Sequence, residues 1–124
     1  MVIVCAVGSF CGTIAQDYET DFRNVQQQFQ ERLNTTSNSL KKYVQEYPYT
    51  PYIDEVQLME GVLHVEKKKY KQAIEVFEKT EAKNLSRSTE PMLYFYWGYA
   101  LLEMEEYEKA LPLFLHLEKK RIQI

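Results

Sequence analysis

The sequence has few of the residues that interrupt regular structure. It contains four glycines and four prolines among 124 residues, which argues against a turn-rich sandwich of short strands. Glutamate, lysine, glutamine and leucine are abundant, and all four favour the helical conformation. The length suits one small domain or a short array of repeats rather than two domains. We therefore predict an all-α protein.

Cysteine is nearly absent. The only two cysteines, Cys5 and Cys11, lie within the first fifteen residues. The remainder of the chain therefore has no thiol with which to form a disulfide or a thiolate metal site.

The sequence also lacks an excess of either charge. It has 15 lysines and arginines and 18 aspartates and glutamates, for a formal net charge of −3, and the two signs are mixed along the chain. Nucleic-acid binding usually requires a basic stripe, and binding to anionic lipid requires a cationic face. We expect neither nucleic acid nor a membrane surface as a partner.

Residues 1–15, MVIVCAVGSFCGTIA, carry no charge. Their apolar run is too short for a spanning helix of about 20 residues, but it fits the hydrophobic region of a secretory signal. Thr13 and Ala15 supply the small residues needed before a cleavage after Ala15. We expect a signal peptide at 1–15, a mature part that does not span the membrane, and a periplasmic or otherwise exported protein. Because no lysine or arginine precedes the run, an upstream start, a buried helix or an uncleaved anchor remain alternatives.

Apolar residues recur at helical spacing along most of the remaining chain. Phe22, Val25 and Phe29, for example, fall on one face of a helix. Polar or proline-containing stretches, such as NTTSNS at 34–39 and YPYTPY at 47–52, separate the periodic segments. The expected helices are residues 17–33, 40–47, 53–66, 70–82, 91–104 and 105–121.

The last two pairs of expected helices are copies of each other. YKQAIEVF begins at Tyr70 and YEKALPLF begins thirty-seven residues later, at Tyr107. The residues shared at this offset are Gly61 with Gly98, Glu66 with Glu103, Tyr70 with Tyr107, Ala73 with Ala110, and Phe77 with Phe114. A shift of 34 places Ser39 under Ala73, so residues 17–52 form a weaker first copy. Each pair leaves an apolar face bare, which the next pair covers.

This pattern resembles the tetratricopeptide repeat (TPR), a helix–turn–helix unit of about 34 residues. The resemblance covers residues 54–120 well and 17–52 poorly. It implies an α-α superhelix of about three antiparallel helix pairs, at 17–52, 54–90 and 91–124, within a domain of residues 16–124. The passage YPYTPYIDE resembles helix junctions of TPR proteins from the bacterial cell envelope.

The resemblance also assigns positions. It implies that the following residues form the core of the repeats: Gly61, Tyr70, Ala73, Phe77, Tyr94, Trp97, Gly98, Leu101, Tyr107, Ala110 and Phe114. It implies that another set lines an inner, concave surface: Leu58, Val62, Val65, Phe95, Tyr99 and Leu102.

The second pair departs from the family pattern in its first helix. Gln57, Glu60 and His64 stand where the third pair has large apolar residues. Either the helix rotates so that its other, apolar residues pack, or the three polar groups are buried together. We predict rotation, because burying an unpaired glutamate costs several kcal/mol. Asp54 and Glu55, at the start of this helix, are expected to be solvated.

No arrangement of residues in the sequence indicates catalysis. His64 and His116 lie in different helices and lack the local spacing of a zinc site. There is no phosphate-binding glycine loop, no Gly-x-Ser-x-Gly turn and no cysteine nucleophile beyond residue 15. We expect neither an enzyme nor a bound cofactor or metal.

The stretch MLYFYWGY, at 92–99, cannot be buried on one stripe of a helix, because successive side chains are about 100° apart. Its exposed members either pack on neighbouring repeats or form an apolar groove for a peptide or helix of a partner protein. We predict a protein-binding scaffold. Glycan binding through tyrosine and tryptophan, or a purely structural spacer, are the alternatives.

The final expected helix has apolar residues with no following helix to cover them. These are Leu113, Phe114, Leu117 and Ile122. Terminal repeats normally present a polar outer face. We therefore expect either the N-terminal part of a longer array or self-association through this helix.

Overall fold

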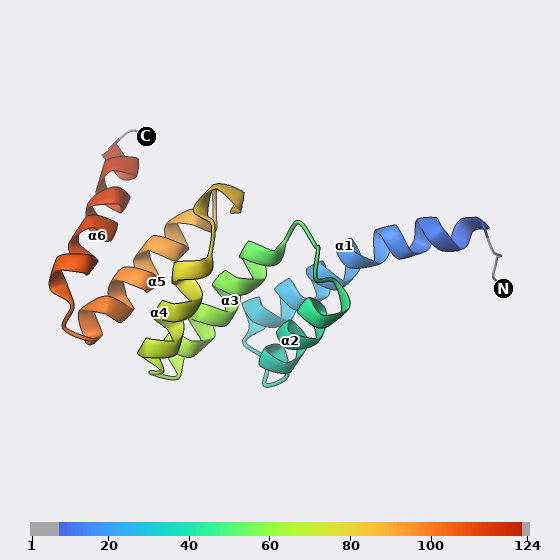
Figure 1. The fold of residues 1–124 in the computed structure, drawn as a ribbon, viewed down its shortest axis with the longest axis horizontal. Coiled ribbons are helices and arrows are strands. Elements are labelled where there is room, and N and C mark those ends of the chain that lie inside the picture. Colours follow the sequence, from blue (N-terminus) through green and yellow to red (C-terminus); the bar gives the residue numbers. More distant parts are fainter. Residues whose placement is uncertain (1–7, 123–124) are drawn as a thin grey trace. The chain divides into compact units, whose positions relative to one another are not determined.

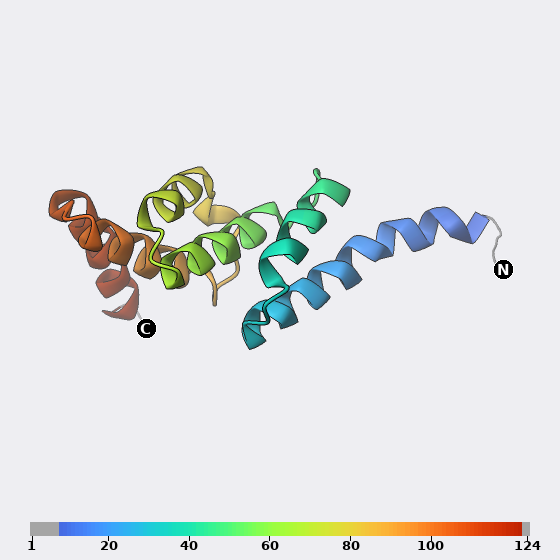
Figure 2. The same cartoon turned by 90° about the horizontal axis from the view of Figure 1, so that it is seen from below.

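A computed structural model describes the backbone of residues 8–122 and the side chains of residues 18–120 (Figures 1 and 2). Every regular element in this range is a helix, which confirms the prediction of an all-α protein. The elements are α1 (Gly8–Glu31), α2 (Thr36–Glu46), α3 (Ile53–Glu66), α4 (Tyr70–Lys79), the short 3₁₀ helix η1 (Ala82–Asn84), α5 (Glu90–Glu103) and α6 (Tyr107–Ile122). They form two compact units, Met1–Pro51 and Tyr52–Ile124.

Helix α1 begins earlier than expected, at Gly8 rather than near Asp17. The second half of the uncharged segment 1–15 is therefore helical and continues into α1, while residues 1–7 lie outside the described residues. The hydrophobic region of a signal and a buried helix would both be helical here. The signal peptide at 1–15 accordingly stays a prediction.

In the first unit, α1 packs against α2. Phe22, Val25 and Phe29 of α1 are buried, as are Leu40 and Tyr43 of α2. This is the apolar face that the helical spacing of the sequence indicated.

The hydroxyl group of Tyr43 takes part in two hydrogen bonds. It donates to the backbone carbonyl of Tyr18 at 3.0 Å, and it lies 2.8 Å from the hydroxyl of Thr50. Burial raises the pKa of the Tyr43 phenol above its ordinary value, so that it stays a neutral donor. The tyrosine therefore ties the chain after α2 back to α1.

In the second unit, α3 pairs with α4 and α5 pairs with α6, and both α3 and α4 contact α5. Helix α3 has turned in the direction predicted from its polar residues. Its buried apolar side chains include Leu58, Met59 and Val62, whereas Gln57 and His64 are only partly buried. The prediction of rotation is confirmed, because this orientation leaves the polar groups in contact with water.

Each of these two helix pairs is closed by a phenylalanine lying over a glycine. A Cβ atom placed on Gly61 would come within 2.2 Å of Cε1 of Phe77, and one on Gly98 within 2.8 Å of Cζ of Phe114. Phe77 is fully buried, whereas Phe114 is only partly so. Gly61 is therefore needed for space, since every larger residue collides with the buried ring of the paired helix, whereas the partly buried ring of Phe114 can move away from a side chain at position 98.

Three turns between paired helices share one backbone geometry. Arg32, Lys68 and Glu105 adopt positive φ angles of 51°, 62° and 61°. In each turn, the amide of that residue donates to the carbonyl three residues before it, and the next amide donates to the carbonyl five residues before its own, at 2.8–3.1 Å. This is the Schellman arrangement, which glycine usually provides. The turns recur after 36 and 37 residues, so the backbone repeats three times, including where the sequence match is weak.

The segment after α4 is fastened to the start of α3 by buried carboxylates, contrary to the expectation that Asp54 and Glu55 are solvated. Both side chains are buried. The two carboxylate oxygens of Asp54 accept hydrogen bonds from the backbone amide of Glu81 at 2.8 Å and from Nδ2 of Asn84 at 2.9 Å. The expectation was wrong because the partners lie about thirty residues further along the chain.

Glu55 fastens the same connection at a second point. Its Oε2 accepts hydrogen bonds from the backbone amide of Ser86 at 2.8 Å and from the hydroxyl of Thr89 at 3.1 Å. Thr89 directly precedes α5. The two carboxylates thus fix both the path of the α4–α5 connection and the point at which α5 begins.

Replacing Gly61 by alanine should destabilise the protein more than the same change at Gly98. Because the added Cβ would come within 2.2 Å of the buried Phe77 ring, overpacking should cost about 2–3 kcal/mol, the upper part of the usual range, and the better helix propensity of alanine offsets about 1 kcal/mol. We expect Gly61→Ala to lower the free energy of unfolding by about 1–2 kcal/mol, and Gly98→Ala to change it by less than about 1 kcal/mol because Phe114 has room to move. Urea denaturation followed by circular dichroism measures both.

Adding Phe77→Leu to Gly61→Ala should recover part of this loss, since the smaller side chain vacates the space that the new methyl group needs. Equal effects of the two alanine substitutions, or no recovery in the double variant, would contradict the packing described for Gly61.

Asp54→Ala should lower the free energy of unfolding by about 2–3 kcal/mol, because it removes two hydrogen bonds to a charged group and leaves the amide of Glu81 without its acceptor. Glu75, an exposed residue of α4, is the matched control. Glu75→Ala should change the free energy by no more than about 0.5 kcal/mol. Similar values for the two variants in urea denaturation would show that Asp54 is solvated.

Candidate functional site

The six residues predicted to line a concave surface divide into two groups of different exposure. Phe95, Tyr99 and Leu102 of α5 are exposed to 50%, 37% and 41%. The others, Leu58, Val62 and Val65 of α3, are buried at 1%, 0% and 6%. The rotation that keeps the polar residues of α3 in water turns these three inward. The exposed apolar surface of the second unit is therefore contributed by α5 rather than shared equally with α3.

A hollow with a volume of about 330 Å³ lies where the end of α3 and the start of α4 meet the middle of α5. We call it the aromatic hollow. Its lining residues are Val65, Glu66, Lys68, Tyr70, Phe95, Tyr96 and Tyr99. Four of the seven are aromatic, and the two charged residues belong to the α3–α4 connection. The hollow thus offers apolar contact area with one charge of each sign beside it.

The aromatic rings of the hollow pack edge to face. The centroids of Tyr70 and Tyr99 are 6.1 Å apart, with an interplanar angle of 68°, and those of Phe95 and Tyr96 are 5.3 Å apart, at 89°. Partial desolvation, with the nearby Tyr99 and then Glu103, raises the pKa of Tyr70. The phenol is therefore a neutral hydrogen-bond donor at physiological pH, and the rings hold one another in place.

The residues predicted for the core of the repeats are mostly found there. Six are buried, namely Gly61, Ala73, Phe77, Gly98, Leu101 and Ala110. Four are partly buried, namely Tyr70, Tyr94, Trp97 and Phe114.

Tyr107 differs from the other predicted core residues, because it is 58% exposed. Its counterpart in the preceding pair, Tyr70, packs on Tyr99 of the following helix. Within the described residues no helix follows α6 to provide such a ring. The prediction that Tyr107 is a core residue was therefore wrong for this structure.

The two histidines are placed apart and in different surroundings. Nε2 of His64 lies 3.9 Å from a carboxylate oxygen of Glu60 at the surface, whereas the ring of His116 stacks on Tyr94 with centroids 4.1 Å apart. Among the described residues no group of three histidine, cysteine, aspartate or glutamate side chains is arranged to hold a metal ion.

Two buried polar atoms between α5 and α6, Nε1 of Trp97 and Nε2 of His116, have no hydrogen-bond partner among the residues that the structure describes. Trp97 therefore directs its indole nitrogen into the protein rather than toward solvent. A sugar-binding platform would instead need an exposed ring face and polar groups beside it.

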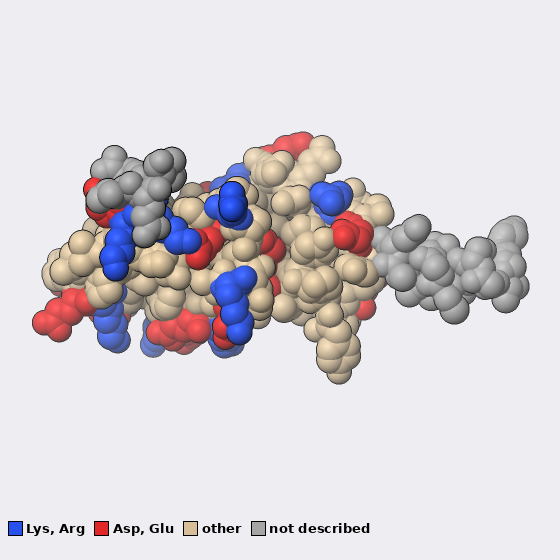
Figure 3. Space-filling model, turned by 90° about the horizontal axis from the view of Figure 1, so that it is seen from above, with Lys and Arg blue, Asp and Glu red and all other residues tan. Residues whose placement is uncertain are grey.

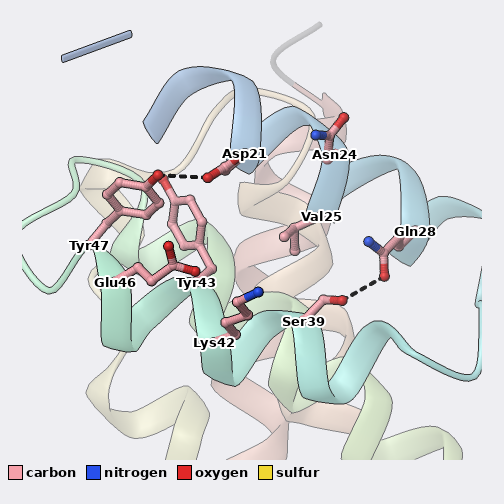
Figure 4. Close-up of a pocket in the computed structure, with 9 residues that line it drawn as sticks. All are labelled: Asp21, Asn24, Val25, Gln28, Ser39, Lys42, Tyr43, Glu46 and Tyr47. Carbon is pink, nitrogen blue, oxygen red and sulfur yellow. Dashed lines mark hydrogen bonds between the residues drawn. The ribbon is translucent and has the colours of Figure 1, made fainter. Parts of the chain in front are cut away.

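The first unit has a more polar hollow of about 200 Å³ between α1 and α2 (Figure 4). Its lining residues are Asp21, Asn24, Val25, Gln28, Ser39, Lys42, Tyr43, Glu46 and Tyr47. The hydroxyl of Tyr47 donates to Asp21 at 2.6 Å, and that of Ser39 donates to Gln28 at 2.8 Å. Because these groups form hydrogen bonds with one another, we interpret the hollow as the polar edge of a helix pair. No motif in the sequence predicted this hollow, since its residues come from two helices and the hydrogen-bonded pairs are 11 and 26 positions apart.

Positive and negative side chains are interspersed over the molecular face in Figure 3, as expected from the mixed signs of the sequence. Across the part of the chain that the structure describes, no helix combines the length and apolar character needed to cross a bilayer.

Comparisons of this chain with protein-family models, with curated proteins and with solved structures find no match in any of the three.

Proposed function

We propose that this chain is a non-enzymatic scaffold of the TPR type that binds another protein through the exposed face of α5. The repeated left-handed turns at Arg32, Lys68 and Glu105 support a repeat architecture. The paired contacts of Gly61 with Phe77 and of Gly98 with Phe114 support it independently. Stacking of such pairs into an α-α superhelix would leave the first helix of each pair along one continuous surface.

The observation that carries the proposal is the half exposure of Phe95 together with Tyr99 at the aromatic hollow. Large aromatic side chains exposed side by side are enriched at protein interfaces and are uncommon on surfaces that contact only water. An amphipathic helix or an extended segment with one or two apolar anchors fits a hollow of this size. The partner is therefore a protein or peptide.

We place this binding in the bacterial cell envelope. The support is the uncharged segment 1–15, which fits a secretory signal, and the resemblance of YPYTPYIDE to helix junctions of envelope TPR proteins. The proposal assigns the mature part neither a cofactor nor a membrane-spanning segment.

The double variant Phe95→Ser, Tyr99→Ser tests the proposal. Phe95 is 50% exposed and Tyr99 37% exposed, so the fold should be retained, while capture of partner proteins from an envelope extract should fall by about tenfold or more, as expected for the loss of two aromatic anchors. Quantitative mass spectrometry of the captured proteins is the measurement. Tyr49→Ser is the matched control, because it removes an exposed aromatic ring of the first unit, and capture should be unchanged.

Unaltered capture by the double variant, or an equal loss with Tyr49→Ser, would refute a binding role for this face. A saturable change of Trp97 fluorescence on titration with glycans would instead support sugar binding.

A further inference from the structure

The two turns of the second unit carry opposite charges. Four lysines and one glutamate give residues 66–71 a formal charge of +3, and four glutamates and one lysine give residues 103–109 a formal charge of −3. We call Lys67, Lys68, Lys69 and Lys71 the basic corner, and Glu103, Glu105, Glu106 and Glu108 the acidic corner. All eight residues are exposed except Glu106, which is partly exposed.

The fold does not require this reversal of sign. Lys68 and Glu105 occupy the same place in the repeat, with φ angles of 62° and 61°. The next residues, Lys69 and Glu106, make equivalent backbone hydrogen bonds, to the carbonyls of residues 64 and 101. At the same offset Lys71 corresponds to Glu108. One backbone geometry thus accepts either sign, so the turn itself does not dictate the charge of either corner.

Within the described residues, the two corners do not neutralise each other. None of the four lysines of the basic corner forms an ion pair there with a glutamate of the acidic corner. At the acidic corner Lys109 pairs with Glu106 at 3.0 Å, inside the acidic segment itself. The exposed lysines of the basic corner therefore remain available to a partner of opposite charge.

The two corners lie along one edge of the unit with apolar residues near both. Both turns lie toward the lower edge of the view in Figure 1, and α3 contacts α5. Lys68 lines the aromatic hollow together with Phe95 and Tyr99, while the exposed Leu102 directly precedes the acidic corner. The edge therefore has the composition of an interface, an apolar centre with a charged rim.

We propose that this edge binds the same edge of a second copy of the chain about a two-fold axis. The basic corner of each copy meets the acidic corner of the other, and Phe95, Tyr99 and Leu102 pack between them. A two-fold interface is self-complementary when the charges on the two sides of its axis are opposite. This inference rests on the proposed function, because it names the partner of the same α5 face.

A second copy meets a requirement that few other partners meet. Any occupant must offer negative charge to the basic corner and positive charge to the acidic corner at matching separation, with apolar groups between. The same edge of a second copy of the chain has this pattern of charges and apolar groups. Because the charges are exposed and screened over about 8 Å at physiological ionic strength, they set orientation and partner choice more than affinity. The dimer should therefore be weak and should weaken further as salt is added.

A charge exchange between matched positions tests the inference. The basic-corner variant is Lys68→Glu, Lys69→Glu, Lys71→Glu, and the acidic-corner variant is Glu105→Lys, Glu106→Lys, Glu108→Lys. Each substitution places in one turn the residue type that the other turn already carries, so both variants should fold. In sedimentation velocity, each variant alone should dimerise at least about tenfold more weakly than the wild type, because like charges then face each other. An equimolar mixture of the two should return to within about threefold of the wild-type dissociation constant.

Three results would overturn the inference: a wild-type chain that stays monomeric at all concentrations, variants that dimerise as the wild type does, or a mixture that does not restore association. Wild-type dimerisation that is insensitive to salt would overturn it as well, without depending on any variant.

The control variant is Leu111→Ser, Leu115→Ser, which removes two exposed leucines of α6 and should leave the dimer intact. Loss of the dimer in this control would locate association on the last helix and reject the corners. If the wild type is monomeric while Phe95→Ser, Tyr99→Ser still loses a captured protein, the inference fails and the proposed function stands.

Discussion

The arrangement of the second unit depends on the close approach of two helices where a phenylalanine ring occupies the space above a glycine. At Gly61 this space is so restricted that the carbon of a single methyl group would lie 2.2 Å from Cε1 of Phe77, far inside van der Waals contact distance. Dispersion contacts at such a crossing are individually small, but they are numerous because the Phe77 ring packs directly on the backbone of α3. The crossing sets the distance between α3 and α4. It thereby decides where the C-terminal end of α3 lies relative to α5, and so the shape of the aromatic hollow.

The buried carboxylates of Asp54 and Glu55 complement this crossing at the opposite end of the helix pair. They bind the backbone of the α4–α5 connection, where the chain would otherwise have unsatisfied amides. An aromatic contact at one end and charge-assisted hydrogen bonds at the other leave α5 little freedom to slide along α3. The exposed rings of α5 are consequently presented by a fixed element.

The sequence predicts the helices and their pairing well, because both depend on short-range periodicity and on an offset that recurs at Gly61, Ala73 and Phe77. It decides the buried faces only in part. The polar residues of α3 indicate how that helix is rotated, but the family resemblance implied an exposed Val62, which tertiary packing buries. Apolar residues occur around nearly the whole circumference of α5, so that only tertiary packing leaves Phe95 exposed. The partners of Asp54 are likewise invisible to local reasoning, since a carboxylate in a first helical turn is ordinarily stabilised there by water and the helix dipole. The left-handed geometry of the turns at Lys68 and Glu105 was not predicted, because the usual signal, a glycine, is absent.

The left-handed turns place charged residues where most proteins place glycine, and this has a consequence for recognition. A residue with a side chain in this conformation costs about 1–2 kcal/mol, but its backbone is fixed by two hydrogen bonds and has few alternatives to adopt. Lys68 and Glu105 therefore project from rigid positions, and only their side-chain torsions must be ordered when a partner arrives. The entropy that a flexible loop would lose on association has largely been lost already during folding.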